Sequence, residues 1–242
     1  MINKFKNEIQ KQKFNPGFFG LIINPFYLIR KSLFRSISKF ANKIEGDILD
    51  LGCGSKPYEP IFIKSKSYIG IDILSGSHNH KDSKYDILYD GKTIPFLDHS
   101  FDAVVSFEVF EHIYDLSIIL KEISRVTKPG GLLLISIPFA WNEHEIPYDY
   151  VRYTSYGLSR IIFDAGFNVI KTEKSNSLLS AISQLLITYI WQNFSCNKLI
   201  VKIILQSLVI FPVTIFTIIL DFVLPTDKSY YSNLILLGQK NT

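Results

Sequence analysis

The sequence predicts an α/β protein in which a largely parallel sheet carries helices on both faces. Short apolar runs alternate with stretches of helical periodicity through the middle of the 242-residue chain, as strands joined by crossover helices do. A Pro129-Gly130-Gly131 turn ends one predicted helix and starts the next strand. The predicted strands cover residues 47–51, 68–72, 86–89, 102–106, 132–137, 167–174 and 233–238, and the predicted helices between them cover 116–126 and 155–165.

The amino-terminal 43 residues are strongly basic. They carry a net charge of +8, which leaves −4 for the rest of a chain whose total is +4. Asn24-Pro25 predicts the start of an amphipathic helix over residues 25–43. A basic arm on an acidic body suits an anionic membrane surface or nucleic acid, and a solvated helix face explains it equally well.

Cysteine content and the amino terminus bear on the compartment. Two cysteines, Cys53 and Cys196, exclude a disulfide framework or a cysteine-zinc cluster and favour a reducing environment. The charged amino terminus predicts no cleavable signal peptide. We therefore expect a cytoplasmic protein without a metal site, and peripheral contact with the inner face of the membrane stays open.

A glycine loop follows the first predicted strand, as Asp50-Leu51-Gly52-Cys53-Gly54. Glycines allow a tight turn and a close approach of ligand to backbone. Asp72 ends the next strand, where a carboxylate can accept both hydroxyls of an adenosine ribose. Dinucleotide-binding loops need a third glycine for the pyrophosphate, and Pro57 stands there. S-adenosylmethionine has no phosphate, so the loop favours this cofactor over NAD.

In this order the motifs resemble the class I S-adenosylmethionine-dependent methyltransferases of the type 11 group, over about residues 45–175. The resemblance implies a Rossmann-like seven-stranded sheet, methyltransferase activity and S-adenosylmethionine as cofactor. Lys56 departs from the family, which often has glycine there, and predicts a stiffer loop. The resemblance places the loop residues Asp50, Gly52, Cys53 and Gly54 at the methionine end, Asp72 at the ribose, Asp90 and Gly91 at the adenine, and Phe107, Glu108 and His112 beside the methyl group.

The segment after the fifth strand, residues 138–154, is rich in aromatic and charged side chains. Loops at the carboxyl ends of strands usually carry function. His144 is a candidate catalytic base because its ordinary pKa is ~6.5, and Asp149 or Glu145 would orient it. Glu145, Arg152 and Tyr153 are candidate acceptor-binding residues, with Arg152 suited to a carboxylate or phosphate. Alternatively, His144 and Arg152 only tie the loop to the domain.

The acceptor is suggested by a second resemblance. The pattern from His144 to Thr154 resembles methyltransferases found among cell-surface polysaccharide assembly enzymes, which implies a sugar hydroxyl or related glycan acceptor. The signature of amino-group methyltransferases is absent, so we expect no nucleic-acid partner. The alternatives are a lipid or quinone-like acceptor, a non-catalytic membrane-associated scaffold, and an NAD oxidoreductase.

Residues 177–229 form an apolar insertion before the last strand. The run 203–220 has no charge and at ~1.5 Å per residue would reach about 27 Å, close to the thickness of a bilayer. A single crossing conflicts with the return of strand 233–238 to the sheet. Helices on a membrane surface, a homodimer interface or lid, and a re-entrant hairpin stay open. The expected segments are a basic arm (1–45), a methyltransferase core (46–176), the insertion (177–229) and the last strand (230–242).

Overall fold

The computed structural model describes residue 8 and residues 11–74, 83–196 and 198–242. The chain divides into two compact units. One comprises the described residues up to Arg35 together with Lys174–Asn233, and the other comprises Ser36–Glu173 together with Leu234–Thr242. Lys4 and Lys6 of the predicted basic arm lie outside the described residues.

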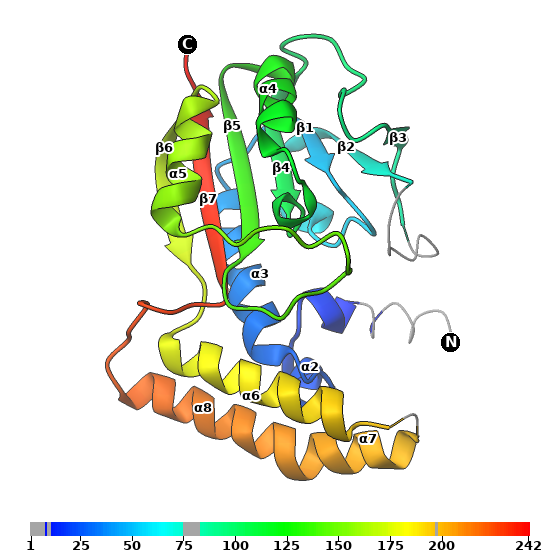
Figure 1. Ribbon diagram of the computed structural model, residues 1–242, viewed down its shortest axis with the longest axis vertical. Coiled ribbons are helices and arrows are strands. Elements are labelled where there is room, and N and C mark those ends of the chain that lie inside the picture. The colour runs from blue at the N-terminus through cyan, green and yellow to red at the C-terminus, as the bar shows by residue number, and fades with distance from the viewer. Residues whose placement is uncertain (1–7, 9–10, 75–82, 197) are drawn as a thin grey trace. The chain divides into compact units, whose positions relative to one another are not determined.

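The second unit is built on one seven-stranded sheet with the order β3-β2-β1-β4-β5-β7-β6 (Figure 1). The pairs β1–β2, β1–β4, β2–β3 and β4–β5 are parallel, whereas β7 runs in the opposite direction to β5 in Figure 1. The predicted sheet is confirmed. Its strands are β1 (Gly46–Leu51), β2 (Ser65–Ile73), β3 (Ile87–Tyr89), β4 (Phe101–Phe107), β5 (Thr127–Pro138), β6 (Phe167–Lys174) and β7 (Asn233–Lys240).

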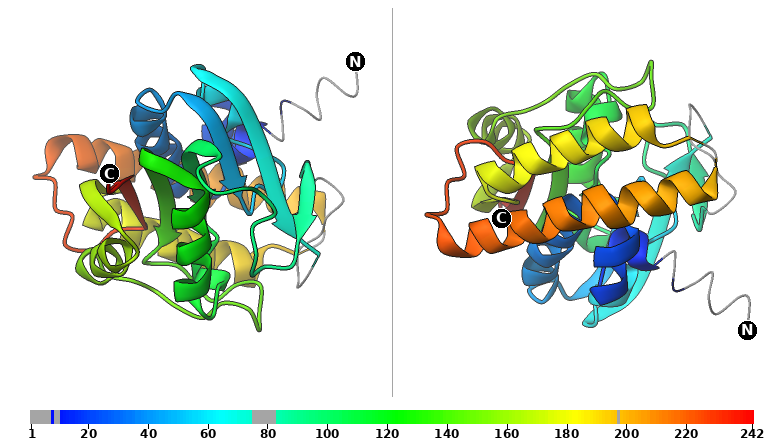
Figure 2. Two further views of the ribbon diagram at one scale, coloured as in Figure 1. Left: turned by 90° about the horizontal axis from the view of Figure 1, so that it is seen from above. Right: turned by 90° about the horizontal axis from the view of Figure 1, so that it is seen from below.

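Helices cover both faces of this sheet, as predicted. The helices α4 (Leu116–Val126) and α5 (Ser155–Asp164) lie on one face, and the carboxyl-terminal part of α3 (Tyr27–Ala41) lies on the other (Figures 1 and 2). Asp115 and Thr154 cap α4 and α5 by accepting backbone N–H bonds with their side chains. The apolar stripe of α4 is buried. The residues that recur with a 3.6-residue period in the sequence therefore form the face that packs on the sheet.

The order of the strands fixes where a ligand can bind. Strands β2, β1, β4 and β5 are parallel neighbours, so their carboxyl ends meet at one edge of the sheet. The chain moves outward from β1 in one direction to β2 and in the other to β4. Ligands of open α/β sheets bind at such a switch point, which lies beside the loop that follows Leu51.

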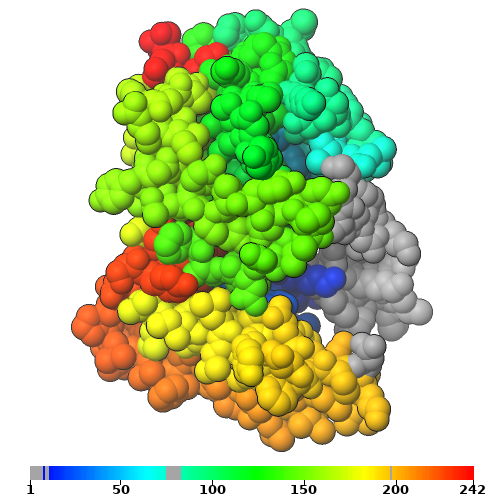
Figure 3. All heavy atoms as spheres, in the orientation of Figure 1, coloured from blue at the N-terminus to red at the C-terminus, as the bar shows by residue number. Residues whose placement is uncertain are grey.

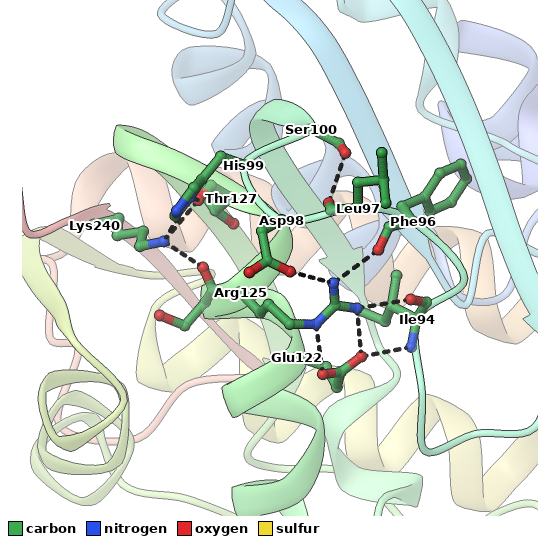
Figure 4. Close-up of polar contacts among 11 residues, drawn as sticks. Ile94, Phe96, Leu97, Asp98, His99, Ser100, Glu122, Arg125, Thr127 and Lys240 are labelled. Atoms are coloured by element: carbon green, nitrogen blue, oxygen red, sulfur yellow. Dashed lines mark hydrogen bonds and ion pairs between the residues drawn. The ribbon is translucent and has the colours of Figure 1, made fainter.

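A long connection between β3 and β4 is held by Arg125 of α4 (Figure 4). Its guanidinium donates to the backbone oxygens of Ile94 and Phe96, both at 2.8 Å, and to the carboxylate of Asp98 at 2.9 Å. Glu122 holds the same guanidinium through both of its oxygens, at 2.7 and 2.8 Å. One side chain thus fixes a segment that has little regular structure of its own, and with it the loop that begins at Asp90.

The first unit is helical and contains α2 (Phe18–Ile23), α6 (Leu178–Phe194), α7 (Leu199–Leu205), the π-helical turn η4 (Gln206–Ile210) and α8 (Phe211–Val223). The last three form one continuous helix, Leu199–Val223, of 25 residues, in which an 18-residue stretch has a mean hydropathy of 2.5 and is 22% buried. By length and composition it could cross a membrane. It lies alongside α6, as the contacts and Figures 1 and 2 agree.

The start of α3 packs within this helical unit. Leu28, Ile187 and Ile210 form its buried apolar cluster, and the Gln184 side chain donates to the backbone oxygen of Pro25 at 3.0 Å. The helix predicted over 25–43 begins two residues later, because the Asn24 side chain accepts from the N–H of Phe26 at 2.9 Å and forms a turn before the helix.

Candidate functional site

The glycine loop turns sharply after β1. Gly52 and Gly54 adopt φ angles of +70° and +48°, the left-handed region that glycine enters without steric cost. A Cβ atom placed on Gly52 would lie 2.5 Å from the Val109 side chain. A Cβ atom placed on Gly54 would meet no heavy atom of the described residues within 4 Å. Gly52 therefore serves packing, and as far as the described residues extend Gly54 borders open space at the switch point.

The Asp72 carboxylate at the end of β2 faces this loop. It accepts from the backbone N–H of Gly54 at 3.1 Å and from that of Ile73 at 2.9 Å, and the residue is only 6% exposed. A buried carboxylate held by two backbone donors has a fixed position and keeps further acceptor capacity. The glycine loop and Asp72, which are 18 residues apart in the sequence at this contact, therefore touch directly.

Asp50 lies inside the sheet on β1, 2% exposed. The Tyr68 hydroxyl on β2 donates to its carboxylate at 2.7 Å. Burial raises the pKa of Asp50 to about 7, and the bond from Tyr68 opposes that rise. Sequence reasoning missed Tyr68, although its place on the strand that pairs with β1 could have indicated it.

Lys56 occupies the position that is often glycine in the family, and here it has a φ of +52°. Its ammonium group is buried and forms an ion pair with Asp86, which also accepts from the N–H of Gly70 at 2.7 Å. The prediction of a stiffer loop agrees with this ion pair, which clamps the loop to the segment before β3. Asp86 was not singled out in the sequence.

Cys53 and the Asp90-Gly91 turn complete the predicted cofactor side. The Cys53 thiol is buried, and burial raises its pKa well above the ordinary value, so it stays protonated. Asp90 is exposed after β3 and accepts from the N–H groups of Lys92 and Thr93 at 2.8 and 2.7 Å. Gly91 has a φ of +76°. Asp90 thus builds its own turn and lies near the end of β3.

The segment after β4 is shaped by Phe107 and Glu108. The Phe107 ring meets the Tyr58 ring edge-on with centroids 4.8 Å apart. Glu108 has a φ of +56° and accepts from the Ser136 hydroxyl of β5 at 2.7 Å. Its own N–H donates to the backbone oxygen of Ser136 at 2.9 Å. These bonds fix the turn that leads into the short helix η3 (Phe110–His112).

On the predicted acceptor side, His144 and Asp149 are in contact. The Nδ1 atom of His144 lies 3.1 Å from a carboxylate oxygen of Asp149, which also accepts from the backbone N–H of His144 at 3.0 Å. Arg152 donates to both Asp149 oxygens at 2.5 and 2.6 Å. The hydrogen bonds from Arg152 lower the pKa of Asp149 to about 2 against the opposing effect of burial. Asp149 therefore stays ionised beside the imidazole.

These contacts bear on the roles expected of Glu145 and Arg152. Asp149 contacts His144, whereas Glu145 lies 3.8 Å from the Nε2 atom of His112. Both terminal nitrogens of Arg152 donate to Asp149, and its role in binding the acceptor stays a prediction. Tyr153 is half-buried, and burial raises the pKa of its phenol. The segment lies at the surface of the molecule in Figure 3.

A third acid, Glu111, lies between two imidazoles. One of its oxygens is 3.7 Å from the Nε2 atom of His112 and 3.8 Å from that of His144. Glu111 is 1% exposed, and among the described residues neither carboxylate oxygen has a hydrogen-bond partner. Burial, then the nearby Glu108 charge, raises the pKa of Glu111 well above its ordinary value. The sequence contains no local signal for this cluster, because His144 comes 33 residues after Glu111.

Comparison with solved structures agrees with this architecture. An S-adenosylmethionine-dependent methyltransferase from Thermotoga maritima superposes with a TM-score of 0.53 at 16% identity and covers all of this chain and 96% of that one. The chain has the Rossmann-like methyltransferase fold. Within it, residues 49–135 match the family described as "Methyltransferase domain", a range that contains the glycine loop, Asp72 and Glu111.

Curated relatives match part of the chain. A probable S-adenosylmethionine-dependent methyltransferase of Mycolicibacterium smegmatis is 32% identical over 106 residues, 41% of each chain. A ubiquinone biosynthesis O-methyltransferase of Bradyrhizobium diazoefficiens is 32% identical over 97 residues, 37% of this chain and 38% of the relative. This chain thus aligns with about two fifths of the length of these relatives.

Proposed function

We propose that this chain is an S-adenosylmethionine-dependent methyltransferase that acts on a hydroxyl group. The observation that carries the proposal is the contact between Asp72 and Gly54: a fixed, buried carboxylate beside a glycine that borders open space at the switch point of the sheet. The hydroxyls of a nucleoside ribose need such a hydrogen-bond acceptor. A cofactor that crosses the loop needs a glycine there, because a side chain would block its approach to the backbone. The match of residues 49–135 to the methyltransferase domain supports the same reading.

The residues fit the parts of this cofactor. Asp72 accepts hydrogen bonds from the ribose hydroxyls, and the backbone of Gly52, Cys53 and Gly54 lines the methionine end. Asp50, ionised when a cation approaches, balances the charge of the amino group. Asp90 and Gly91 face the adenine, and Phe107, Glu108 and His112 border the methyl end. When bound, the cofactor supplies a methyl carbon activated by its sulfonium sulfur.

On the other side His144 takes the proton of the acceptor. Burial lowers the pKa of His144, so its imidazole is neutral near pH 7. Asp149 accepts a hydrogen bond from the Nδ1–H group and leaves Nε2 as the basic nitrogen. As the oxygen–methyl bond forms and the sulfur–methyl bond breaks, the hydroxyl proton passes to Nε2, and the Asp149 charge stabilises the imidazolium.

We infer a sugar of a surface-glycan precursor as the acceptor. The exposed rings of Tyr148 and Tyr150 offer faces on which sugars stack, and Tyr114 packs edge-on against Tyr150 at 5.5 Å. A lipid or quinone-like molecule is the competing acceptor, and a relative named for ubiquinone biosynthesis favours it. Incubating the protein with methyl-labelled cofactor and an envelope extract tests the proposal. Label in a glycan fraction supports it, and label in extracted quinone supports the competing acceptor. Absence of label from every fraction contradicts the proposed methyltransferase activity.

We further propose that the helical unit contacts a lipid bilayer. The helix Leu199–Val223 exposes large apolar side chains along its length, among them Leu208 at 72%, Phe216 at 62% and Phe222 at 92%. Exposed apolar surface of this extent marks an interaction site. Lys198 and Lys202 at its start, with Arg30 and Lys31, make the described part of this unit basic, which suits anionic lipid.

The helix is proposed to lie in the membrane plane. The last strand β7 returns to the same sheet as β5, so one crossing would leave it on the far side of the bilayer. Buried Thr214 and Thr217 form the opposite side of α8, as expected of a helix with one face packed on protein and one face in lipid. Such a protein is cytoplasmic and peripheral to the membrane. A second copy of the chain is the competing occupant of this surface.

A further inference from the structure

We propose that Glu111, His112 and His144 bind a divalent transition-metal ion of the zinc type. The two cysteines of the chain gave no reason to expect a metal site. This inference rests on the proposed function and refines its acceptor side. The three ligand atoms, one from each residue, all lie within 4.8 Å of one another.

The distances suit a shared ion. Two ligands ~2.1 Å from a zinc ion at a tetrahedral angle lie about 3.4 Å apart. The Glu111 oxygen is 3.7 Å from Nε2 of His112 and 3.8 Å from Nε2 of His144. These two gaps are too long for hydrogen bonds, and each of them exceeds the spacing of two zinc ligands by only a few tenths of an ångström.

The outer nitrogens of both imidazoles are already held. Nδ1 of His112 lies 2.8 Å from the backbone oxygen of Tyr148. Nδ1 of His144 lies 3.1 Å from Asp149 and 3.3 Å from the backbone oxygen of Asn142. Because these acceptors select the tautomers protonated at Nδ1, the Nε2 lone pairs of both rings point toward Glu111. Metal-binding histidines are oriented by outer hydrogen bonds of this kind.

Glu111 supplies the second, independent observation. Its side chain is 1% exposed, and neither oxygen has a hydrogen-bond partner among the described residues. A buried carboxylate without partners is costly. A cation between it and the two lone pairs removes that cost and the repulsion among the three groups.

Three protein ligands leave a coordination position open, as in catalytic zinc sites. The side chains of His112 and His144 are 15% and 31% exposed, so this position faces the predicted acceptor side. An ion held there would make an acceptor hydroxyl at the open position more acidic, so that its proton would leave to solvent more readily. His144 would then be a ligand, and the ion would take over the deprotonation that the proposed function assigns to His144 in the metal-free protein.

Cobalt(II) titration of the tag-free, chelator-treated full chain tests the site without any use of activity. We expect one ion per chain, with the intense visible bands of a low-coordinate cobalt(II) complex, and displacement of cobalt by zinc. His112→Ala, His144→Ala and Glu111→Gln should each weaken binding at least tenfold. His99→Ala is the matched control, because His99 bonds to the backbone oxygen of Thr127 away from the cluster, and it should bind cobalt as the wild type does.

Zinc should also raise the melting temperature of the wild type and of His99→Ala, and leave that of His144→Ala unchanged. This measurement stays valid for a variant that is less stable, because the melting temperature of each protein is compared with and without zinc. Absence of the visible bands in the folded wild type, or equal zinc stabilisation of His144→Ala, overturns the metal site. Calorimetry with S-adenosylmethionine separates the two proposals. Cofactor binding without cobalt bands contradicts the metal site alone. Cobalt bands without cofactor binding support the metal site and contradict the proposed function.

Discussion

The Asp72 carboxylate accepts a hydrogen bond from the backbone N–H of Gly54 at 3.1 Å. This bond joins the end of β2 to the loop after β1 and sets the ribose acceptor beside the glycine that borders open space. We therefore expect the two residues to belong to one binding site, so that a substitution of either should affect binding of the same ligand.

Gly54→Ala should abolish or strongly weaken cofactor binding while the protein stays folded. The added methyl group meets no described heavy atom, so its effect on the fold is the strain of a positive φ, on the order of 1 kcal/mol. Gly130→Ala is the matched control, because Gly130 has a φ of +73° and equally open surroundings but lies in the turn within β5. Calorimetry should show lost binding in the first variant only; equal affinity in both would place the ligand elsewhere. Gly52→Val is a poorer test, because it collides with Val109.

Cofactor affinity should rise with pH between about 5.5 and 7. Burial raises the pKa of Asp50 to about 7, so the carboxyl is protonated below that pH and must ionise to pair with an ammonium group. Binding then releases a proton, and affinity should fall up to about tenfold per pH unit below 7. Asp50→Asn should bind weakly with no such slope. A flat wild-type profile in calorimetry would remove Asp50 from the ammonium site.

Because its pKa is raised, Asp50 should destabilise the unliganded fold at high pH. Between about pH 4 and 7 the folded state holds a proton that the unfolded state has lost, so the contribution of Asp50 to the free energy of unfolding declines as pH rises through this range. Asp50→Asn should therefore gain stability over the wild type at pH 8 and lose that advantage at pH 4, as urea unfolding measures.

Asp149→Asn should lower kcat about 100-fold and leave cofactor affinity unchanged. The amide cannot hold the Nδ1 proton of His144 as a carboxylate does, and it loses the charge that pairs with Arg152. The control is Asp164→Asn, which breaks an exposed ion pair with Arg160 and should change neither quantity. A normal kcat in Asp149→Asn would reduce the His144–Asp149 contact to a structural role.

The full chain should float with anionic vesicles, and salt should weaken the binding in part. Screening acts over ~8–10 Å at physiological ionic strength and removes the attraction of the lysines, whereas the apolar face binds independently of salt. Phe222→Asp together with Leu208→Asp should reduce flotation, and Leu97→Asp, at an equally exposed residue of the other unit, should not. A protein that stays at the bottom at low salt and sediments as a dimer would assign the surface to a second copy.

Local patterns in the sequence were sufficient for the sheet and for the cofactor side. Helix α4 was predicted at its exact bounds because its apolar period and the following Pro129-Gly130-Gly131 turn agree. Asp72 and the glycine loop each follow a strand, and parallel pairing brings strand ends to one edge whatever the side chains are. The start of β2 at Ser65 and the extension of β5 back to Thr127 carry weaker patterns, so these strand ends were less well placed.

Contacts between distant residues were beyond such patterns. The pairs Tyr68–Asp50 and Lys56–Asp86 depend on strand register and on a non-glycine residue at positive φ. The meeting of Glu111 with His144 depends on how the segment after β5 folds back over η3. No periodicity encodes that path, although the backbone bond from Tyr150 to the oxygen of Glu111 at 2.8 Å fixes it.

Titration calorimetry of S-adenosylmethionine into the wild type and Asp72→Asn tests the central claim most directly. A hydrogen bond to a charged group is worth about 1.5–3 kcal/mol, and ~1.4 kcal/mol is a factor of ten in affinity. We expect one bound S-adenosylmethionine per wild-type chain, at least tenfold weaker binding to Asp72→Asn, and no binding of NAD to either protein. Equal affinity in the two proteins, or binding of NAD in preference to S-adenosylmethionine, would contradict it.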